Sequence, residues 1–123
     1  MNKVELTGHL TADAEFAQTV NGNDHCSFRL AVKRPFSEKA SFINIDVWGK
    51  SAENCSKYLK KGDKVGIVGW LRTSTYEDKN GIIKYSTNVV AEDVEFLVLK
   101  NFNTIHKEEQ ELEVIDEDEK LPF

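Results

Sequence analysis

The central part of the sequence carries aromatic and polar side chains in an order that could hold a flat ligand by stacking. Residues 41–50 read SFINIDVWGK, and this alternation has the period of two that is typical of a β-strand. One side of the strand is apolar and consists of Ile43, Ile45 and Val47. The other side mixes Phe42, Asn44, Asp46 and Trp48. Aromatic rings on that side either pack beneath a neighbouring element or stay open to a flat ligand such as a nucleobase, and the strand alone leaves both interpretations open.

Further aromatic residues fall in the segments that flank this strand, and basic residues lie between them. The candidate stacking residues are Phe36, Phe42, Trp48 and Tyr76, with Trp70 as a fifth that could instead cover a subunit interface. The interleaved basic residues, which are candidate phosphate contacts, are Lys33, Arg34, Lys50, Arg72, Lys79 and Lys84. Each nucleotide of an unpaired strand offers a π-face and a phosphate, so this combination predicts binding of single-stranded nucleic acid with weak sequence preference.

The strands that position these residues follow from hydrophobic periodicity. We expect strands over residues 4–10, 26–33, 41–50, 64–73 and 86–99. Gly8 interrupts the first strand, which predicts a bulge or a close backbone approach. In the fourth strand, Val65, Ile67 and Leu71 are expected to point inward.

One helix and two hairpin turns complete the expected order. Helical spacing over residues 50–61 predicts the helix, with Ser51 as its N-cap and Gly62 after its C-terminus. Turn signals at 21–24 and 78–81 predict the hairpins. A five-stranded barrel with a helix between its third and fourth strands is the OB-fold, so the predicted class is all-β with one helix. In that fold the second and third strands and two neighbouring loops form the surface for oligonucleotides or oligosaccharides.

Charge divides the chain into a neutral body and an acidic end. Residues 100–123 contain eight of the 21 acidic residues but only three of the 16 basic ones, which leaves acidic and basic residues equal in number over residues 1–99. We therefore expect an OB-fold domain over 1–99 and a disordered acidic tail over 100–123. Because the body is neutral, nucleic-acid binding has to rest on local clusters of cations rather than on net charge.

The sequence contains no complete pattern that would indicate catalysis, metal binding or secretion. The tripeptide GKS at 49–51 imitates the end of a phosphate-binding loop, but Asn44 stands where the first glycine is required. Cys26 and Cys55 have no CxxC spacing, which predicts free buried thiols rather than a disulfide or a zinc site. The N-terminus does not resemble a signal peptide. We expect a cytoplasmic protein without enzymatic activity, metal, cofactor or membrane association.

Runs of residues along most of the predicted domain match the motifs of one known family. They include VELTGHLT at 4–11, FRLAVKRPF at 28–36, FINIDVWGK at 42–50, YLKKG at 58–62 and GWLRT at 69–73. Through these runs the sequence resembles the bacterial-type single-stranded DNA-binding proteins, which are also found in phages and mobile elements. The resemblance implies an OB-fold that assembles as a homotetramer and wraps single-stranded DNA in replication, recombination and repair, associated with the nucleoid. It also implies base stacking at the positions of Phe36, Phe42, Trp48 and Tyr76.

The C-terminal sequence DEDEKLPF at 116–123 resembles the acidic tip through which this family binds replication, recombination and repair proteins. The resemblance implies partner contacts by Asp116, Glu117, Asp118, Glu119, Leu121, Pro122 and Phe123. Lys120 interrupts the acidic run, and the linker over 100–115 is short and rich in glutamate. Taken from the residues alone, an apolar Leu-Pro-Phe ending suits a small basic pocket on another protein.

Two other functions remain open at the level of the sequence. An OB-fold of this composition could read RNA or tRNA, as cold-shock and synthetase-appended domains do. Alternatively, the aromatic residues on the polar side could form a subunit interface with no role in nucleic-acid binding. Competition between matched DNA and RNA strands distinguishes the first alternative, and tryptophan quenching by a DNA strand distinguishes the second.

Overall fold

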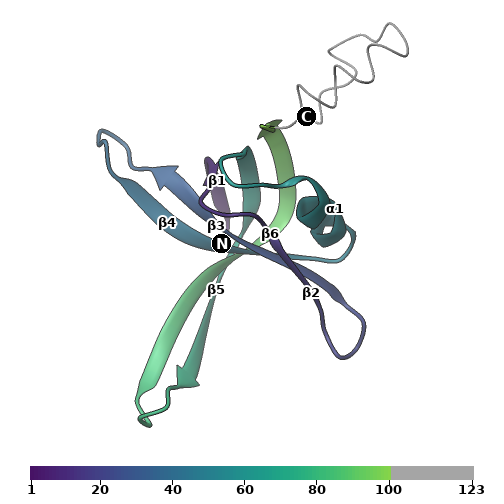
Figure 1. The fold of residues 1–123 in the computed structure, drawn as a ribbon. Coiled ribbons are helices and arrows are strands. Elements are labelled where there is room, and N and C mark those ends of the chain that lie inside the picture. Colours follow the sequence, from purple (N-terminus) through teal and green to yellow (C-terminus); the bar gives the residue numbers. More distant parts are fainter. Residues whose placement is uncertain (101–123) are drawn as a thin grey trace, which may run out of the picture.

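Six strands and one helix make up the part of the chain that the computed structural model describes, residues 1–100 (Figure 1). In chain order they are β1 (Val4–Leu10), β2 (Glu15–Gln18), β3 (Asp24–Lys33), β4 (Ala40–Trp48), α1 (Lys50–Tyr58), β5 (Lys64–Glu77) and β6 (Ile83–Val98). The predicted acidic tail beyond Lys100 and its partner-binding tip lie outside the described residues. The described part contains no helix with the length and apolarity of a membrane span.

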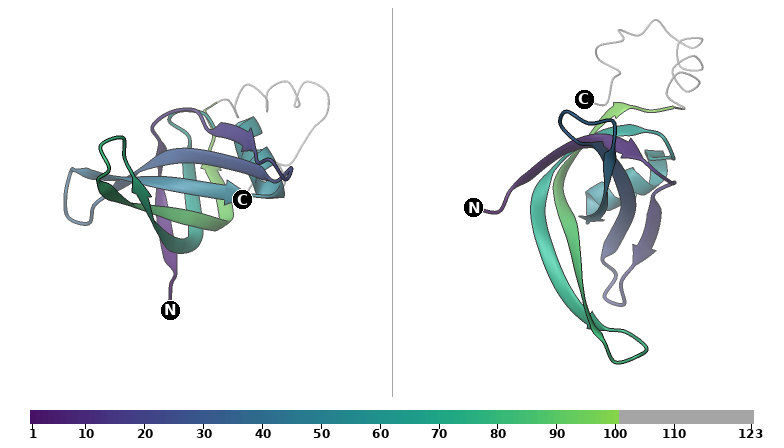
Figure 2. Two further views of the ribbon diagram at one scale, coloured as in Figure 1. Left: turned by 90° about the horizontal axis from the view of Figure 1, so that it is seen from below. Right: turned by 90° about the vertical axis from the view of Figure 1, so that its left-hand side faces the viewer.

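Five of the strands close into a barrel. Hydrogen-bonded neighbours follow the order β1-β5-β6-β4-β3, and β1 also pairs with β3, which joins the two ends of the sheet. β4 and β6 run parallel, whereas the other barrel pairs are antiparallel. α1 follows the third barrel strand and packs against β3 and β4 (Figure 2). The OB-fold expected from the sequence is confirmed, with one addition: the short strand β2 pairs with β3 outside the barrel.

Closure of the barrel depends on glycine where two strands approach closely. Gly8 of β1 lies against the backbone of Ala31 in β3, and a Cβ atom at position 8 would collide with the Ala31 carbonyl. Gly69 of β5 lies equally close to the Val90 carbonyl of β6. The close backbone approach predicted at Gly8 is therefore confirmed. By contrast, a Cβ atom at Gly66 would make only ordinary van der Waals contacts, the nearest at 3.7 Å from a leucine side chain.

Apolar residues from the barrel strands and from α1 fill the interior. The buried members include Leu30, Ile45, Val47, Val65, Ile67 and Val89 from the strands and Ala52, Cys55 and Leu59 from the helix and its end. Cys26 and Cys55 are both buried free thiols, as the sequence predicts. Burial disfavours the thiolate and raises the pKa of Cys26 to about 11 and that of Cys55 to about 12. The two cysteines therefore behave as small apolar core residues.

The helix is shorter than the sequence predicts and is capped differently. Gly49, with a φ of 78°, occupies the N-cap without a side-chain hydrogen bond, so the expected cap at Ser51 is wrong. α1 ends at Tyr58 instead of residue 61, because Leu59 adopts an extended conformation and enters the core. Gly62 lies in the turn that follows, where its φ of 88° suits glycine.

A buried carboxylate, Asp63, fastens the turn after α1 to the end of β6. Its Oδ2 accepts a hydrogen bond from the backbone N–H of Lys60 at 2.8 Å, and its Oδ1 accepts one from the backbone N–H of Lys100 at 2.7 Å. The backbone carbonyl of Asp63 accepts a further bond from the N–H of Leu10 at 2.9 Å. Asp63 is therefore satisfied despite its burial, and it joins β1, the start of β5 and the last described residue.

β5 and β6 extend beyond the barrel as a two-stranded projection, here called the arm (residues 72–88). Figure 1 shows the arm at the bottom of the view, pointing away from the barrel and α1. The sequence predicts this hairpin and its turn at 78–81, but it ends the strands at 73 and 86, short of Glu77 and Ile83. Leu71, expected inside the barrel, is 47% exposed, because β5 leaves the barrel there and no interior remains for the side chain to enter.

Candidate nucleic-acid interface

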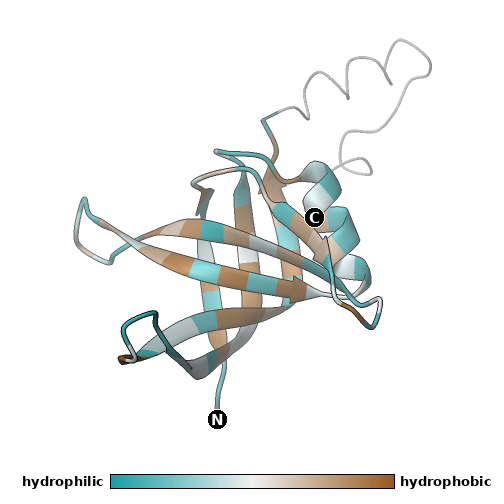
Figure 3. Cartoon of the chain, turned by 60° about the horizontal axis from the view of Figure 1, so that its bottom comes forward, coloured by the Kyte–Doolittle hydropathy of each residue, from teal (hydrophilic) through white to brown (hydrophobic). Residues whose placement is uncertain are grey.

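β3 and β4 present one open face to solvent, here called the β3–β4 face, and their register sets which residues share it. The outward-facing cross-strand pairs are Ala31 with Phe42, Arg29 with Asn44, Ser27 with Asp46 and His25 with Trp48. Phe42 is 54% exposed and Trp48 40%, while Ile45 and Val47 are fully buried on the other side of β4. Figure 3 shows the alternation of hydrophobic and hydrophilic residues along these strands. Neither ring is packed inside the protomer.

Each exposed ring on the β3–β4 face has a companion from β3. The guanidinium of Arg29 lies over the Phe42 ring, 4.7 Å from its centroid. The His25 ring packs against Trp48 with centroids 4.3 Å apart and planes tilted by 36°. The protein thus supports one side of each ring and leaves the other side for a flat ligand. Neither Arg29 nor His25 is among the residues that the sequence singles out, and only the cross-strand register brings them to the aromatic residues.

Asp46 points to the outer side of β4, two residues before Trp48, yet it is only 6% exposed. Its Oδ1 lies 2.9 Å from Nε2 of His25. Its Oδ2 accepts hydrogen bonds from Nη2 of Arg72 and Nδ2 of Asn88, both at 3.0 Å. Three side chains from three other strands therefore converge on one carboxylate. No set of three His, Cys, Asp or Glu residues that could hold a metal ion occurs among residues 1–100.

A groove of about 340 Å³ lies between the two aromatic positions of the β3–β4 face. Its polar lining consists of Ser27 and Arg29 of β3, Asn44 and Asp46 of β4, Asn88 of β6, Glu15 of β2 and Asp13 just before β2. The face is therefore aromatic at its two ends and polar in the middle. Rings at the ends can stack on bases, and the polar groups between them can form hydrogen bonds with base edges or sugars.

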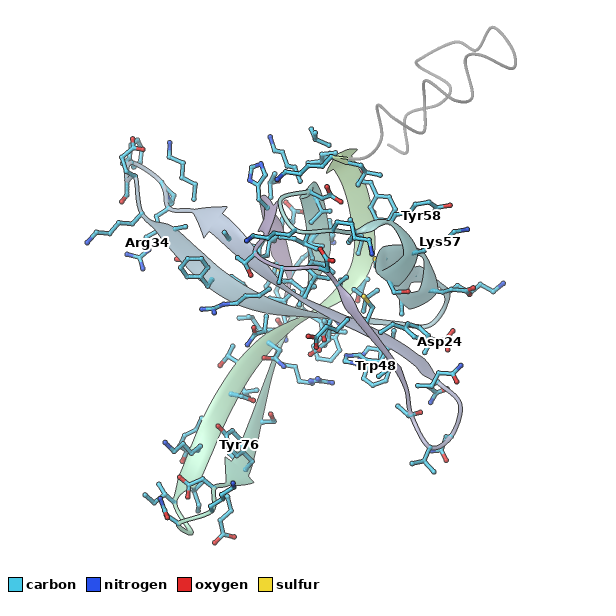
Figure 4. All side chains as sticks on the ribbon, viewed as in Figure 1. Asp24, Arg34, Trp48, Lys57, Tyr58 and Tyr76 are labelled. Atoms are coloured by element: carbon cyan, nitrogen blue, oxygen red, sulfur yellow. The ribbon has the colours of Figure 1, made fainter. Side chains whose placement is uncertain are left out.

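The other predicted stacking residues lie on projections or beside the barrel rather than on the β3–β4 face. Phe36 is fully exposed in the loop between β3 and β4, with a φ of 59°. Tyr76 is 54% exposed on the arm, and Figure 4 shows its side chain well away from Trp48. Trp70 is partly buried on β5. The structure thus keeps all five aromatic candidates out of the core but brings only Phe42 and Trp48 onto one face.

Known proteins with similar sequences match most of the described chain. The family model described as the single-strand binding protein family matches residues 1–97. This chain belongs to that family. The resemblance found in the sequence is thereby confirmed.

Two relatives show how far the similarity to other members of the single-strand binding protein family extends. Single-stranded DNA-binding protein 1 of Clostridium acetobutylicum is 43% identical in an alignment of 106 positions that covers 81% of this chain and 96% of that protein. A single-stranded DNA-binding protein of Staphylococcus aureus strain MRSA252 is 45% identical in an alignment of 108 positions that covers 84% of this chain and 69% of the relative. The family model, which spans residues 1–97, includes both the barrel and the arm.

The basic residues predicted to contact phosphates in this single-strand binding protein lie around the β3–β4 face and along the arm. Their positions are the end of β3 and the loop after it for Lys33 and Arg34, the first turn of α1 for Lys50, and the arm for Arg72, Lys79 and Lys84. Two of them have carboxylate neighbours. Arg72 pairs with Asp46, and Nζ of Lys84 lies 3.9 Å from Oδ2 of Asp78. The charge of Arg72 is therefore already partly offset before any ligand binds.

Proposed function

We propose that this protein binds single-stranded DNA through the β3–β4 face, without catalysis and largely independently of sequence. The observation that carries the proposal is the pair of open, supported rings at Phe42 and Trp48 with a polar groove between them. Stacking tolerates any base, because every base has a π-face. The relatives, which are themselves called single-stranded DNA-binding proteins, support the same ligand.

The DNA strand follows β4 from Phe42 to Trp48 and continues onto both projections. The two rings are six positions apart in an extended strand, a distance of roughly 20 Å at about 3.3 Å per residue. Bases stack on these two rings, and nucleotides between them meet the polar groove. Phe36 extends the path into the loop after β3, and Tyr76 extends it along the arm. Each stack contributes about 1–3 kcal/mol, so a few stacks provide most of a sub-micromolar affinity.

The cations around this path bind the phosphates. They are Lys33, Arg34, Lys50, Arg72, Lys79 and Lys84, with Arg29 as an addition that rests on its position at Phe42. Because the ordered body is neutral overall, these local contacts supply the attraction to the backbone. Affinity then falls with salt concentration, with a logarithmic slope of about −0.7 for each phosphate neutralised on a single strand.

The oligomeric state, the cellular role and the C-terminal tip complete the proposal. Within the cytoplasm, at the nucleoid, the protein coats exposed strands as a homotetramer during replication, recombination and repair. Its OB-fold domain over 1–99 holds the DNA, and residues 116–123 recruit partner proteins. The acidic run followed by Leu-Pro-Phe supports this division, since carboxylates steer towards a basic pocket and an apolar end anchors there. Trp70 lies near the subunit contacts or at the edge of the DNA path.

Titration with oligo-dT tests the binding proposal. We expect quenching of tryptophan fluorescence on adding oligo-dT and a salt-dependent affinity. A tenfold preference for matched oligo-U would assign the face to RNA, and absence of any quenching would favour a subunit interface. Mass determination with and without oligo-dT gives the number of subunits and the stoichiometry together.

Deletion of residues 116–123 tests the role of the tip. The truncated protein is expected to bind oligo-dT equally or more tightly, because the acidic residues no longer compete with DNA for the cations. It is also expected to lose the capture of replication and repair proteins. Capture that survives the deletion would contradict the docking role while leaving the DNA-binding proposal intact.

A further inference from the structure

Within residues 1–100, the side-chain hydrogen bonds between the arm and the β3–β4 face all go to one residue, Asp46. Next to the arm, β6 also pairs with β4 through residues 89–91. Arg72 and Asn88 face each other in the β5–β6 pairing at the point where the arm leaves the barrel. Beyond this pair, residues 73–77 pair only with residues 83–87. Both Arg72 and Asn88 donate to Oδ2 of Asp46 at 3.0 Å. The root of the arm is therefore fastened to β4 from both of its strands.

The second oxygen of the same carboxylate reaches the aromatic end of the β3–β4 face. Oδ1 of Asp46 lies 2.9 Å from Nε2 of His25, and the His25 ring packs against Trp48. One carboxylate thus fixes the support of Trp48 and the root of the strands that carry Tyr76. Figure 4 shows these two labelled rings on different parts of the molecule, Trp48 beside the barrel and Tyr76 on the arm.

A carboxylate is an unexpected group beside a path for DNA, because its negative charge repels phosphates. Its burial also has a cost unless its oxygens are hydrogen-bonded, and both oxygens of Asp46 have partners, which come from three strands. A role in attracting DNA therefore does not explain a carboxylate at position 46. Its three side-chain contacts do explain it, because they join residues from three other strands. The residue connects the elements that carry the stacking rings.

We propose that Asp46 is a positioning residue that holds the arm and the Trp48 ring in a fixed relation, so that Tyr76 and Trp48 stack on one DNA strand. The proposal rests on the function proposed above. Without this link the base of the arm would be held by the β4–β6 pairing at 89–91 alone, so the arm would sample more orientations and ordering it on binding would oppose association. With the link in place the arm is ordered before the DNA arrives.

A double-mutant cycle between Asp46 and Tyr76 tests this relation, because no side-chain contact joins the two residues. Asp46→Ala is expected to bind a long oligo-dT about tenfold more weakly, which corresponds to about 1.4 kcal/mol. If Asp46 acts by placing Tyr76, then adding Asp46→Ala to Tyr76→Ala causes a clearly smaller further loss than Asp46→Ala causes in the wild type. The matched control pairs Asp46→Ala with Phe36→Ala, which lies in the loop between β3 and β4 rather than on the arm and is expected to be additive.

Asp46→Asn separates the hydrogen bonds from the charge. Asparagine keeps an oxygen that accepts from Arg72 and Asn88 but removes the negative charge near the phosphates. We expect this variant to bind oligo-dT at least as tightly as the wild type. Circular dichroism melting confirms that each variant folds, and Asn88→Ala replaces Asp46→Ala in the cycle if the latter does not fold. In the free protein, amide hydrogen exchange over 73–77 and 83–87 is expected to be faster in Asp46→Ala.

The outcomes separate this proposal from the proposed function. Wild-type protein that fails to bind oligo-dT would overturn both. Binding by the wild type, combined with additive losses for Asp46 and Tyr76 or with no loss for Asp46→Ala, would overturn the positioning role alone. Unchanged affinity of Tyr76→Ala would likewise overturn it, because the arm would then have no ring for Asp46 to place.

Discussion

Arg29 and Phe42 lie diagonally across the pairing of β3 and β4, and the guanidinium covers one face of the ring at 4.7 Å from its centroid. A cation on a ring face is attracted to it by about 0.5–1 kcal/mol at exposed sites. The arrangement also brings a positive charge to the place where a stacked nucleotide would carry its phosphate. Arg29 therefore belongs to the candidate interface, although the sequence pattern alone gives it no role.

Replacing Arg29 by glutamine is expected to weaken binding of oligo-dT and to reduce the steepness of its salt dependence by about 0.7, which corresponds to one lost phosphate contact. Lys57→Gln is the matched control, because Lys57 also lies over a ring, that of Tyr58 at 5.3 Å, but on α1 outside the β3–β4 face. Affinity measured by fluorescence at several salt concentrations gives both quantities. An unchanged slope for Arg29→Gln would remove Arg29 from the phosphate path.

Trp48 is expected to report the binding of DNA more strongly than Trp70. If the exposed Trp48 ring stacks on a base as proposed, Trp48→Phe is expected to remove most of the quenching by oligo-dT yet keep most of the affinity. Trp48→Ala removes the stack and weakens binding by about 1–3 kcal/mol. Trp70→Phe serves as the control and retains the quenching. If Trp70→Phe lost the quenching and Trp48→Phe retained it, the DNA path would lie on β5 instead.

Gly8→Ala is expected to destabilise the barrel, because the added methyl group collides with the Ala31 carbonyl at the closure between β1 and β3. Overpacking of this kind costs about 1–3 kcal/mol. Gly66→Ala adds the same methyl group in open packing and is expected to change the free energy of unfolding by less than about 0.5 kcal/mol. Urea denaturation followed by circular dichroism compares the two variants. Equal stability of both would show that the closure tolerates a side chain at position 8.

The buried thiols predict a loss of stability at alkaline pH. A cysteine in the unfolded chain has its ordinary pKa of 9.0, whereas burial raises the pKa of Cys26 to about 11 and that of Cys55 to about 12. Between pH 9 and those values the unfolded state therefore binds fewer protons than the folded state, and stability falls as pH rises. Well below pH 9 the thiols make no pH-dependent contribution, because they are protonated in both states.

A comparison of the wild type with a Cys26→Ala, Cys55→Ala double variant checks this effect, because all other titrating groups are shared. The wild type is expected to lose more free energy of unfolding between pH 8 and pH 10. In the folded wild type at pH 8, neither thiol is expected to react with a disulfide reagent until urea is added. Rapid reaction of either thiol without urea would contradict the burial on which the prediction rests.

The sequence predicts the barrel well because its local signals agree with one another. The alternation in β4 predicts that Ile45 and Val47 point inside and that Phe42 and Trp48 point outside. The observed burial of these four residues agrees with that pattern. The helix, the turn of the arm and the close approach at Gly8 follow from equally local features. In all of these cases the signal that predicts the feature lies within a few residues of sequence, even where the contact itself, such as Gly8 with Ala31, joins distant strands.

The features that the sequence does not predict depend on where distant strands meet. The three partners of Asp46 lie 21, 26 and 42 positions away in the sequence, so no local pattern could indicate its burial. Leu71 continues a regular alternation, but the pattern contains no information about where the barrel ends. β2 escapes prediction for a different reason: all four of its residues are exposed, and a strand without a buried face has no hydrophobic period.

Asp63 determines where the remainder of the chain departs from the folded part. Its bond to the backbone of Lys100 fixes that exit beside the turn after α1, and Figure 1 shows the end of β6 and the tip of the arm on opposite sides of the barrel. If a partner binds residues 116–123 as proposed, a pull on that segment reaches the folded domain at Lys100 and its contact with Asp63, on the side away from the tip of the arm. Force applied to residues 101–123 and binding of DNA at the arm would then act on opposite ends of one small domain.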